Sequence, residues 1–146
     1  MTRIHFYHGA RDRIQAAAEW LAQAFAIRRH ALAFVPDQDM ANRLDHLLWT
    51  RGATSFIPHC RADSRLAEET PILISSGIHS PVGQQHLLNL DHAVPAEFAR
   101  FEEIIEIVST DDGDRLPARD RYRFYRERGY ELIDRKVSEG FILERS

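Results

Sequence analysis

Cysteine, lysine and long apolar runs are all scarce in this chain of 146 residues. Cys60 is its only cysteine, so an intramolecular disulfide is impossible and a reducing, cytosolic environment is the expected setting. No apolar run approaches the roughly 20 residues of a membrane span, and the chain does not open on a basic segment followed by an apolar one. These absences predict a soluble, unexported, cytoplasmic protein.

Glycine-rich motifs that bind phosphate are missing as well. Residues 7–10, after the first predicted strand, read YHGA and not G-x-G-x-x-G. A G-x-x-x-x-G-K-[ST] motif is absent, and the only lysine is Lys136. Gly77 and Gly83 are too far apart for a tight phosphate nest. We therefore expect neither ordinary nucleotide binding nor any other cofactor.

Histidine is abundant, but its spacing does not suit a metal site. His5 and His8 are three residues apart on a predicted strand, so they point to opposite faces. His59 and Cys60 are adjacent, with no second cluster at ligand spacing. The serines at 75–76 do not form a G-x-S-x-G nucleophile elbow. The sequence predicts no metal and no catalytic residues.

Two hydrophobic periods alternate along the chain and predict an α/β fold. Strands are predicted at residues 3–8, 31–35, 55–57, 72–75, 87–90, 104–108 and 130–133. Helices are predicted at about 12–28, 40–49 and 114–128, with a helical turn at 98–101, a loop from 58 to 71 and a frayed end after 133. Strands that alternate with helices favour a parallel sheet. We expect one domain over residues 1–146, a three-layer Rossmann-like domain with a mostly parallel central sheet and helices on both faces.

Charge is unevenly distributed. The net charge of -3 argues against a protein that coats duplex DNA by bulk electrostatics. Residues 115–128, however, hold six arginines against Asp120 and Glu127, a local excess of four positive charges. A local basic patch on an acidic protein indicates a defined anionic partner.

This basic segment is predicted to be a helix. Asp114 is the expected N-cap, Pro117 is tolerated in the first turn, and Gly129 ends the helix. At about 100° per residue, four arginines fall in one quadrant of the helix, with Tyr122 on its border: Arg115, Arg119, Arg123 and Arg126. This face suits an acidic peptide that ends in an aromatic residue. It could equally be a solvated face of paired charges.

A second cluster combines the end of the second helix with the short segment after it. Residues 47–49 read LLW and residues 55–59 read SFIPH. Trp and Phe in such places are most often core residues, and core is the favoured interpretation here. They can also form an apolar anchor for a partner.

Several short tracts, in order and spacing, resemble the chi subunit family of bacterial DNA polymerase III along nearly the whole chain. They are FY at 6–7, LDHLLW at 44–49, SFIPH at 55–59, PILI at 71–74, EIV at 106–108, ARDRYRFY at 118–125 and GY at 129–130. The resemblance implies a non-catalytic Rossmann-like adaptor without a cofactor, which acts at the replisome and nucleoid and bridges two partners of the replication machinery.

The first implied partner is the single-stranded DNA-binding protein, whose acidic tail ends in a phenylalanine and a free carboxylate. By resemblance the tail contacts Arg115, Arg119, Tyr122 and Arg123, and Val108 lines the pocket for the terminal ring. Such contacts would tether single-stranded DNA-binding protein to the clamp loader.

The second implied partner is the psi subunit or an equivalent clamp-loader component, with an accessory repair helicase as a competitor for the same surface. Its contact lies around Trp49, Phe56 and Pro58. No membrane and no sequence-specific nucleic acid is expected as a partner. The alternative is a direct single-stranded nucleic-acid-binding module, in which Arg and Tyr of the basic helix contact phosphates and bases.

Overall fold

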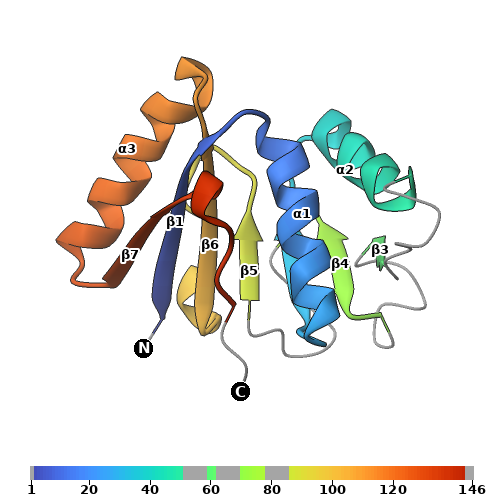
Figure 1. Ribbon diagram of the computed structural model, residues 1–146. Helices are drawn as coiled ribbons and strands as arrows, with labels where there is room; N and C mark the ends of the chain where they lie inside the picture. Colours follow the sequence, from blue (N-terminus) through green and yellow to red (C-terminus); the bar gives the residue numbers. More distant parts are fainter. Residues whose placement is uncertain (1, 51–58, 62–69, 78–85, 144–146) are drawn as a thin grey trace.

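The computed structural model describes residues 2–50, 59–61, 70–77 and 86–143, which form a layered α/β fold (Figure 1). Seven strands lie in one sheet in the order β3-β4-β2-β5-β6-β1-β7, and every neighbouring pair is parallel. The strands are β1 (Arg3–Ala10), β2 (Ala31–Phe34), β3 (His59–Arg61), β4 (Ile72–Ser75), β5 (His86–Asn89), β6 (Glu103–Ser109) and β7 (Glu131–Lys136). The sheet predicted to be mostly parallel is thus parallel throughout these strands.

Helices cover both faces of this sheet, as predicted. They are α1 (Arg13–Ala26), α2 (Gln38–Thr50) and α3 (Asp112–Glu127), with 3-10 turns η2 (Phe98–Arg100) and η3 (Val137–Glu139). α1 and α2 pack on one face, where Leu21 and Leu44 are fully buried. α3 and η2 pack on the other face through Tyr125 and Phe98. Because both faces are covered, residues 104–109 of β6 are all buried.

The start of α1 follows the prediction. Asp12 is its N-cap, and the Asp12 carboxylate accepts hydrogen bonds from the backbone N–H groups of Ile14 and Gln15 at 2.9 and 3.1 Å. These bonds satisfy two donors that have no partner inside the helix. The helix ends at Ala26, slightly before the predicted end, and Arg28 then takes a left-handed conformation with φ of 60°.

The start of α3 differs from the prediction. Its N-cap is Asp111, not Asp114, and the Asp111 carbonyl accepts the N–H groups of Asp114 and Arg115. Pro117 therefore lies in the second turn, where its missing N–H leaves out one hydrogen bond near the amino end of the helix. Three acidic residues precede Arg115, and sequence pattern alone does not decide which of them caps. Gly129 follows the end of the helix with φ of +78°, as predicted.

The strand β3 was not predicted, since the chain from 58 to 71 was expected to be a loop. His59 and Arg61 pair in parallel with Ile72 and Ile74 of β4. The three residues HCR show no alternation of apolar and polar side chains, so the sequence does not predict a strand here. This edge strand forms by pairing with its neighbour β4. The strand predicted at 55–57 lies outside the described residues.

The segment after residue 133 was expected to be frayed. It packs instead on the α1 face of the sheet. β7 runs to Lys136, and the ring of Phe141 then meets the buried ring of Tyr7 edge-on at 4.8 Å. The Tyr7 hydroxyl donates to the carbonyl of Ile142 and accepts its N–H, at 3.2 and 3.3 Å. These contacts join residues 135 positions apart, which local pattern does not reveal.

Candidate functional site

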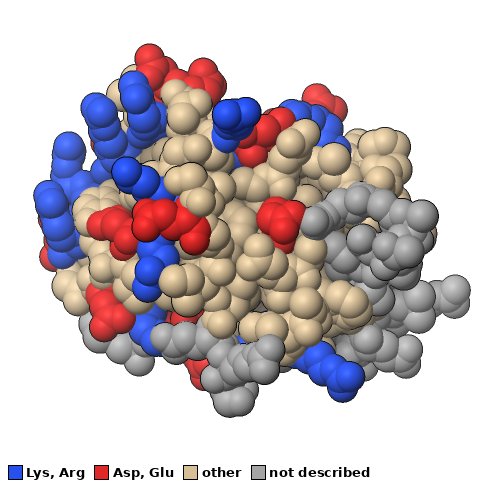
Figure 2. Space-filling view, in the orientation of Figure 1, with Lys and Arg blue, Asp and Glu red and all other residues tan. Residues whose placement is uncertain are grey.

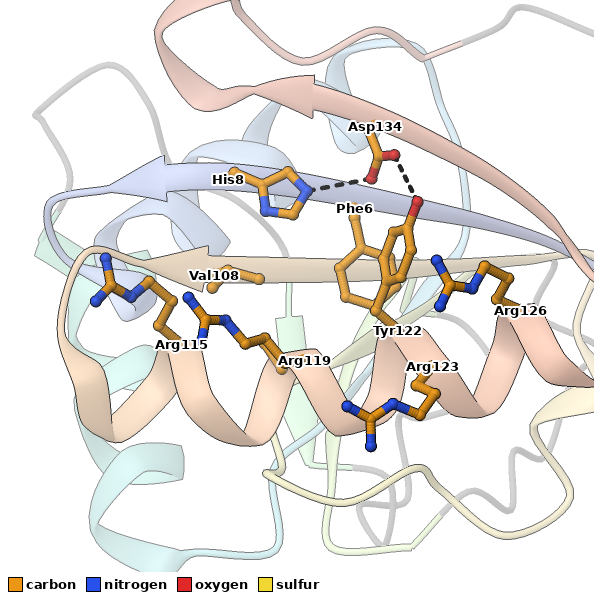
Figure 3. A pocket seen from close by; sticks show the side chains of 10 residues that line it. Phe6, His8, Val108, Arg115, Arg119, Tyr122, Arg123, Arg126 and Asp134 are labelled. Carbon is orange, nitrogen blue, oxygen red and sulfur yellow. Dashed lines mark hydrogen bonds and ion pairs between the residues drawn. The ribbon is translucent and has the colours of Figure 1, made fainter.

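A cavity of about 530 Å³ lies between α3 and the three strands beneath it (Figure 3). It is lined by Phe6 and His8 of β1, Val108 of β6, Asp134 of β7, and Arg115, Ala118, Arg119, Tyr122, Arg123 and Arg126 of α3. All five residues predicted to contact an acidic tail are among them. We call this cavity the α3 pocket.

The topology of the sheet explains why these residues meet. α3 connects β6 to β7, and β1 lies between those two strands. Alternate residues of a strand share a face, so Phe6 and His8 both face α3, and Asp134 is the register partner of Phe6. Residues three and four apart on α3 line up above them. Ala118, only 4% exposed, allows the helix to lie close to the sheet.

Tyr122 forms a fixed aromatic wall of the α3 pocket. Its ring meets the ring of Phe6 edge-on, with centroids 5.1 Å apart, and its hydroxyl donates to Asp134 Oδ2 at 2.8 Å. This hydrogen bond to a carboxylate, with some loss of hydration, raises the pKa of Tyr122 above its ordinary value. The guanidinium of Arg126 lies 5.9 Å from the centre of the ring. The wall is thus held from the sheet below and from the helix above.

The arginines of the pocket differ in what they already contact. Arg115 forms an ion pair with Asp112, one turn earlier, at 2.5 Å. Within the described part of the chain, neither Arg119 nor Arg123 has an ion pair or hydrogen bond, and both are exposed. Figure 2 shows basic side chains gathered along the side of the molecule where α3 lies. Arg119 and Arg123 are therefore available for an external anion.

Arg121 was counted in the basic patch, and the structure corrects this. It is 2% exposed and lies under the helix, where its Nε donates to Glu106 Oε1 at 3.0 Å. The Glu106 carboxylate also accepts from Asn89 and Tyr125, at 2.9 and 3.0 Å. Burial first, and then the Glu106 carboxylate, raise the pKa of Tyr125, so its hydroxyl remains a donor. Without Arg121, the excess over residues 115–128 is three positive charges.

Sequence reasoning did not assign Phe6, His8 and Asp134 to the pocket. The sequence could have placed Phe6 and His8 on the same face of the sheet, because residues two apart on a strand share a face. The sequence offered no indication for Asp134, because this residue lies beyond the end of the predicted last strand. Its place beside Phe6 depends on the pairing of β1 with β7. Only the register of parallel strands brings these residues to α3.

The second predicted surface is described only in part. Trp49, at the end of α2, is 57% exposed, so the favoured interpretation of this residue as core is wrong. Its ring lies edge-on to the ring of His59 at 5.5 Å, and His59 Nε2 is 3.0 Å from Asp45 Oδ1. The neighbouring Leu48 takes the core position instead. Phe56 and Pro58 lie outside the described residues.

The described residues contain neither a cluster of metal-ligating side chains nor a helix that could span a membrane. No group of three or more His, Cys, Asp or Glu side chains is placed to hold a metal ion there. His5 and His8 point to opposite sides, as predicted: His5 meets Glu103 and His8 meets Asp134. In the same part of the chain, no helix is both long and apolar enough to cross a membrane.

Solved structures with a similar fold include the C-terminal domain of the DEAD-box protein Dbp5. It superposes with a TM-score of 0.59 and 12% identity, over 94% of this chain and 91% of that one. The Dbp5 C-terminal domain of S. cerevisiae bound to Gle1 and IP6 gives a TM-score of 0.61, also at 12% identity, over 94% and 90%. At this identity the likeness concerns the α/β fold alone.

Sequence comparison is more specific. The family model of the DNA polymerase III chi subunit, HolC, matches residues 1–133. The DNA polymerase III subunit chi of Pseudomonas aeruginosa is 30% identical over 94% of this chain and 98% of its own length. The subunit of the same name from Escherichia coli is 30% identical over 81% of both chains, and that of Haemophilus influenzae is 28% identical over 84% and 86%. The chain belongs to the DNA polymerase III chi subunit family.

Proposed function

We propose that this protein is a non-catalytic adaptor of the replication machinery. Its α3 pocket binds the acidic C-terminal tail of single-stranded DNA-binding protein and so tethers that protein to the clamp loader. The observation that carries the proposal is the α3 pocket itself, in which four arginines and an aromatic wall surround one cavity of about 530 Å³. Membership of the chi subunit family supports the same function.

The chemistry of the pocket suits a tail with carboxylates and a terminal phenyl ring. Arg119 and Arg123 are free to form bidentate hydrogen bonds with carboxylates. Phe6, Val108 and the Tyr122 ring provide an apolar wall for the phenyl group. The ligand thus gains both charge-assisted hydrogen bonds and burial of an aromatic ring. A ligand with carboxylates alone, or with a phenyl ring alone, would form only one of these two kinds of contact.

Tethering follows from the strength expected for one such contact. A few charge-assisted hydrogen bonds, less the cost of ordering a flexible tail, correspond to a dissociation constant of roughly micromolar order. Many tails are present where single-stranded DNA-binding protein coats the template, so repeated weak contacts hold the adaptor in place. A weak, repeated contact also permits rapid exchange along the lagging strand.

The exposed Trp49 supports a second contact in this proposal. An aromatic side chain with 57% of its surface in solvent, at the end of a helix, is a suitable anchor for a protein partner. The psi subunit or an equivalent clamp-loader component would bind around Trp49, Phe56 and Pro58, where an accessory repair helicase would compete. Trp49 lies at the end of α2 and the α3 pocket under α3, at opposite ends of the sheet order. Both partners could therefore bind at the same time.

The first test is fluorescence anisotropy with a labelled peptide from the C-terminus of single-stranded DNA-binding protein. Saturable binding is expected, and a peptide without the final phenylalanine should not bind. Arg119→Ala should weaken binding roughly tenfold to a hundredfold, since a hydrogen bond to a charged group contributes about 1.5–3 kcal/mol. Arg43→Ala, which removes an exposed arginine from α2, is the matched control and should bind as the wild type does.

Two results would oppose the proposal. Equal binding of Arg119→Ala and wild type would show that the tail does not use this face of α3. A folded protein that binds neither peptide but binds a labelled single-stranded oligonucleotide would favour direct nucleic-acid binding by the basic helix.

A further inference from the structure

A polar cluster lies on the face of the sheet that α1 covers, opposite the α3 pocket. Its centre is Glu103 of β6, whose side chain is 12% exposed. Glu103 Oε1 lies 2.9 Å from His5 Nε2 and 3.1 Å from Arg3 Nη2, both on β1. Glu103 Oε2 lies 2.6 Å from His86 Nε2 of β5. These side chains meet because β5, β6 and β1 are neighbours, with Glu103 the register partner of both Arg3 and His86.

The carboxylate of Glu103 determines which nitrogen of His86 carries a proton. Hydrogen bonds from His5 and His86 hold the pKa of Glu103 far below its ordinary value, so this carboxylate is ionised and can only accept. His86 therefore donates through Nε2. In the neutral imidazole the other nitrogen, Nδ1, is then an acceptor. Nδ1 is buried and has no hydrogen-bond partner in the described part of the chain.

Trp20 of α1 presents the complementary case. Its side chain is 0% exposed, and the indole Nε1–H, which can only donate, is buried without a partner among the residues that the structure describes. The Trp20 ring is a neighbour of the His86 ring, with centroids 5.9 Å apart and planes inclined by 52°. One unpartnered donor and one unpartnered acceptor thus lie close together in the core. Each would be costly if it stayed without a hydrogen bond.

A small void of about 10 Å³ lies at the same place. It is lined by Trp20, His86, His5, Glu103 and Ile105, and by Ile142 and Leu143 of the C-terminal segment. This volume is about the smallest that can hold a water molecule. It has no room for a larger ligand.

We propose that this void binds one structural water molecule. The water accepts the hydrogen bond of Trp20 Nε1 and donates one to His86 Nδ1. Glu103 also lines the void, so its carboxylate is within the same surroundings as an acceptor for the second hydrogen of the water. Two or three polar partners are typical of a buried water.

Water fits these two nitrogens better than an ion does, because one nitrogen needs an acceptor and the other a donor. A cation would lie against the indole N–H of Trp20, and an anion would lie beside the ionised Glu103. Two hydrogen bonds of about 2.9 Å that meet at one oxygen span up to about 5.8 Å. The distance between the two ring centres is close to this span.

The proposed water joins parts of the chain that are distant in sequence. Trp20 belongs to α1 and His86 to β5, while Ile142 and Leu143 come from the segment after β7. Both nitrogens then have the partner that buried polar groups require. The site is independent of the proposed function, because it lies on the other face of the sheet.

The first test uses NMR of the full chain labelled with ¹⁵N. Laboratory-frame and rotating-frame spectra should show a dipolar cross-peak between water and the Trp20 indole proton, with the sign given by a water that tumbles with the protein. Trp49 is the matched control in the same molecule. It is 57% exposed, so its indole proton should show only exchange with bulk solvent.

A crystal structure of the full chain gives the position of the water directly. One ordered water is expected within about 3.2 Å of both Trp20 Nε1 and His86 Nδ1. A long-range proton–nitrogen NMR spectrum should in addition show the imidazole proton of His86 on Nε2 and none on Nδ1.

Three results would each overturn the inference. They are the absence of a dipolar cross-peak at the Trp20 indole proton, the absence of an ordered water between the two nitrogens, and a proton on His86 Nδ1. None of these results changes the proposed function, which the tail-peptide titration tests separately.

Discussion

Glu106 and Arg121 form an ion pair with almost no exposure to solvent, beneath the helix that carries the α3 pocket. Glu106 is 0% and Arg121 2% exposed; Arg121 donates to Glu106 Oε1, and Asn89 and Tyr125 both donate to Oε2. A buried pair rarely adds net stability, but loss of one partner leaves the other charge uncompensated. This residue pair therefore matters for the position of α3 and not for contact with a ligand.

Replacement of Arg121 should separate an effect on the stability of the fold from an effect on ligand binding. Arg121→Leu should lower the free energy of unfolding by about 3–5 kcal/mol, because Glu106 then remains buried without its counter-charge. Arg123→Leu, two residues further along the same helix and exposed, should change it by about 0.5 kcal/mol or less. Urea denaturation followed by circular dichroism measures both.

In tail binding, the larger effect should come from the replacement of Arg123 and not from that of Arg121. Arg123→Leu should weaken tail binding and remain as stable as wild type. Equal stability of the two variants would contradict the role assigned to Arg121.

At the scale of the element, the two helices α1 and α3 begin in different ways. Asp12 caps α1 with two side-chain hydrogen bonds to backbone N–H groups. Asp111 occupies the same position in α3 but makes no such bond, and α3 contains Pro117 in its second turn. The start of α3 is instead tied down by Asp114, which accepts a hydrogen bond from Ser109 and pairs with His92.

This difference gives a direct comparison between two caps. Asp12→Ala should cost about 1 kcal/mol of stability, the usual effect of removing a capping side chain. Asp111→Ala should cost only a few tenths, because it removes no capping hydrogen bond. Thermal denaturation of both variants measures the difference, and a larger loss for Asp111→Ala would contradict this description of the two helix starts.

At the scale of the whole molecule, the basic surface is local. The chain carries a net charge of -3, yet exposed arginines gather along α3 (Figure 2). This distribution suits attraction of a defined acidic segment better than general attraction to a polyanion. The contacts lie in solvent, so dissolved ions can screen them.

Tail binding should therefore weaken with salt. Raising NaCl from about 0.1 M to about 1 M shortens the Debye length from about 10 Å to about 3 Å. The anisotropy titration should show a steady loss of affinity over this range, and Arg119→Ala should show a shallower loss because it has one charge fewer to screen. Affinity that is independent of salt would assign the binding to apolar contacts alone.

Much of this architecture can be predicted from the sequence. Buried strands such as β6 and amphipathic helices such as α1 have strong local patterns, and so does the face of α3 that holds Arg115, Arg119 and Arg123. β3 and the packed segment after residue 136 were missed, because contacts distant in sequence form them. β3 forms by pairing with β4, and the segment after residue 136 packs against Tyr7.

The sequence by itself determined the α/β class, the basic face of α3 and the family to which the chain belongs. These depend on residue types at short spacing, where helical and strand periods act directly. Only the tertiary structure decided that Arg121 is buried while Arg119 is exposed, and that Asp134 lies within hydrogen-bond distance of both His8 and Tyr122. The physical reason is that parallel pairing places β1, β6 and β7 side by side under α3, although their residues lie up to about 130 positions apart in the chain.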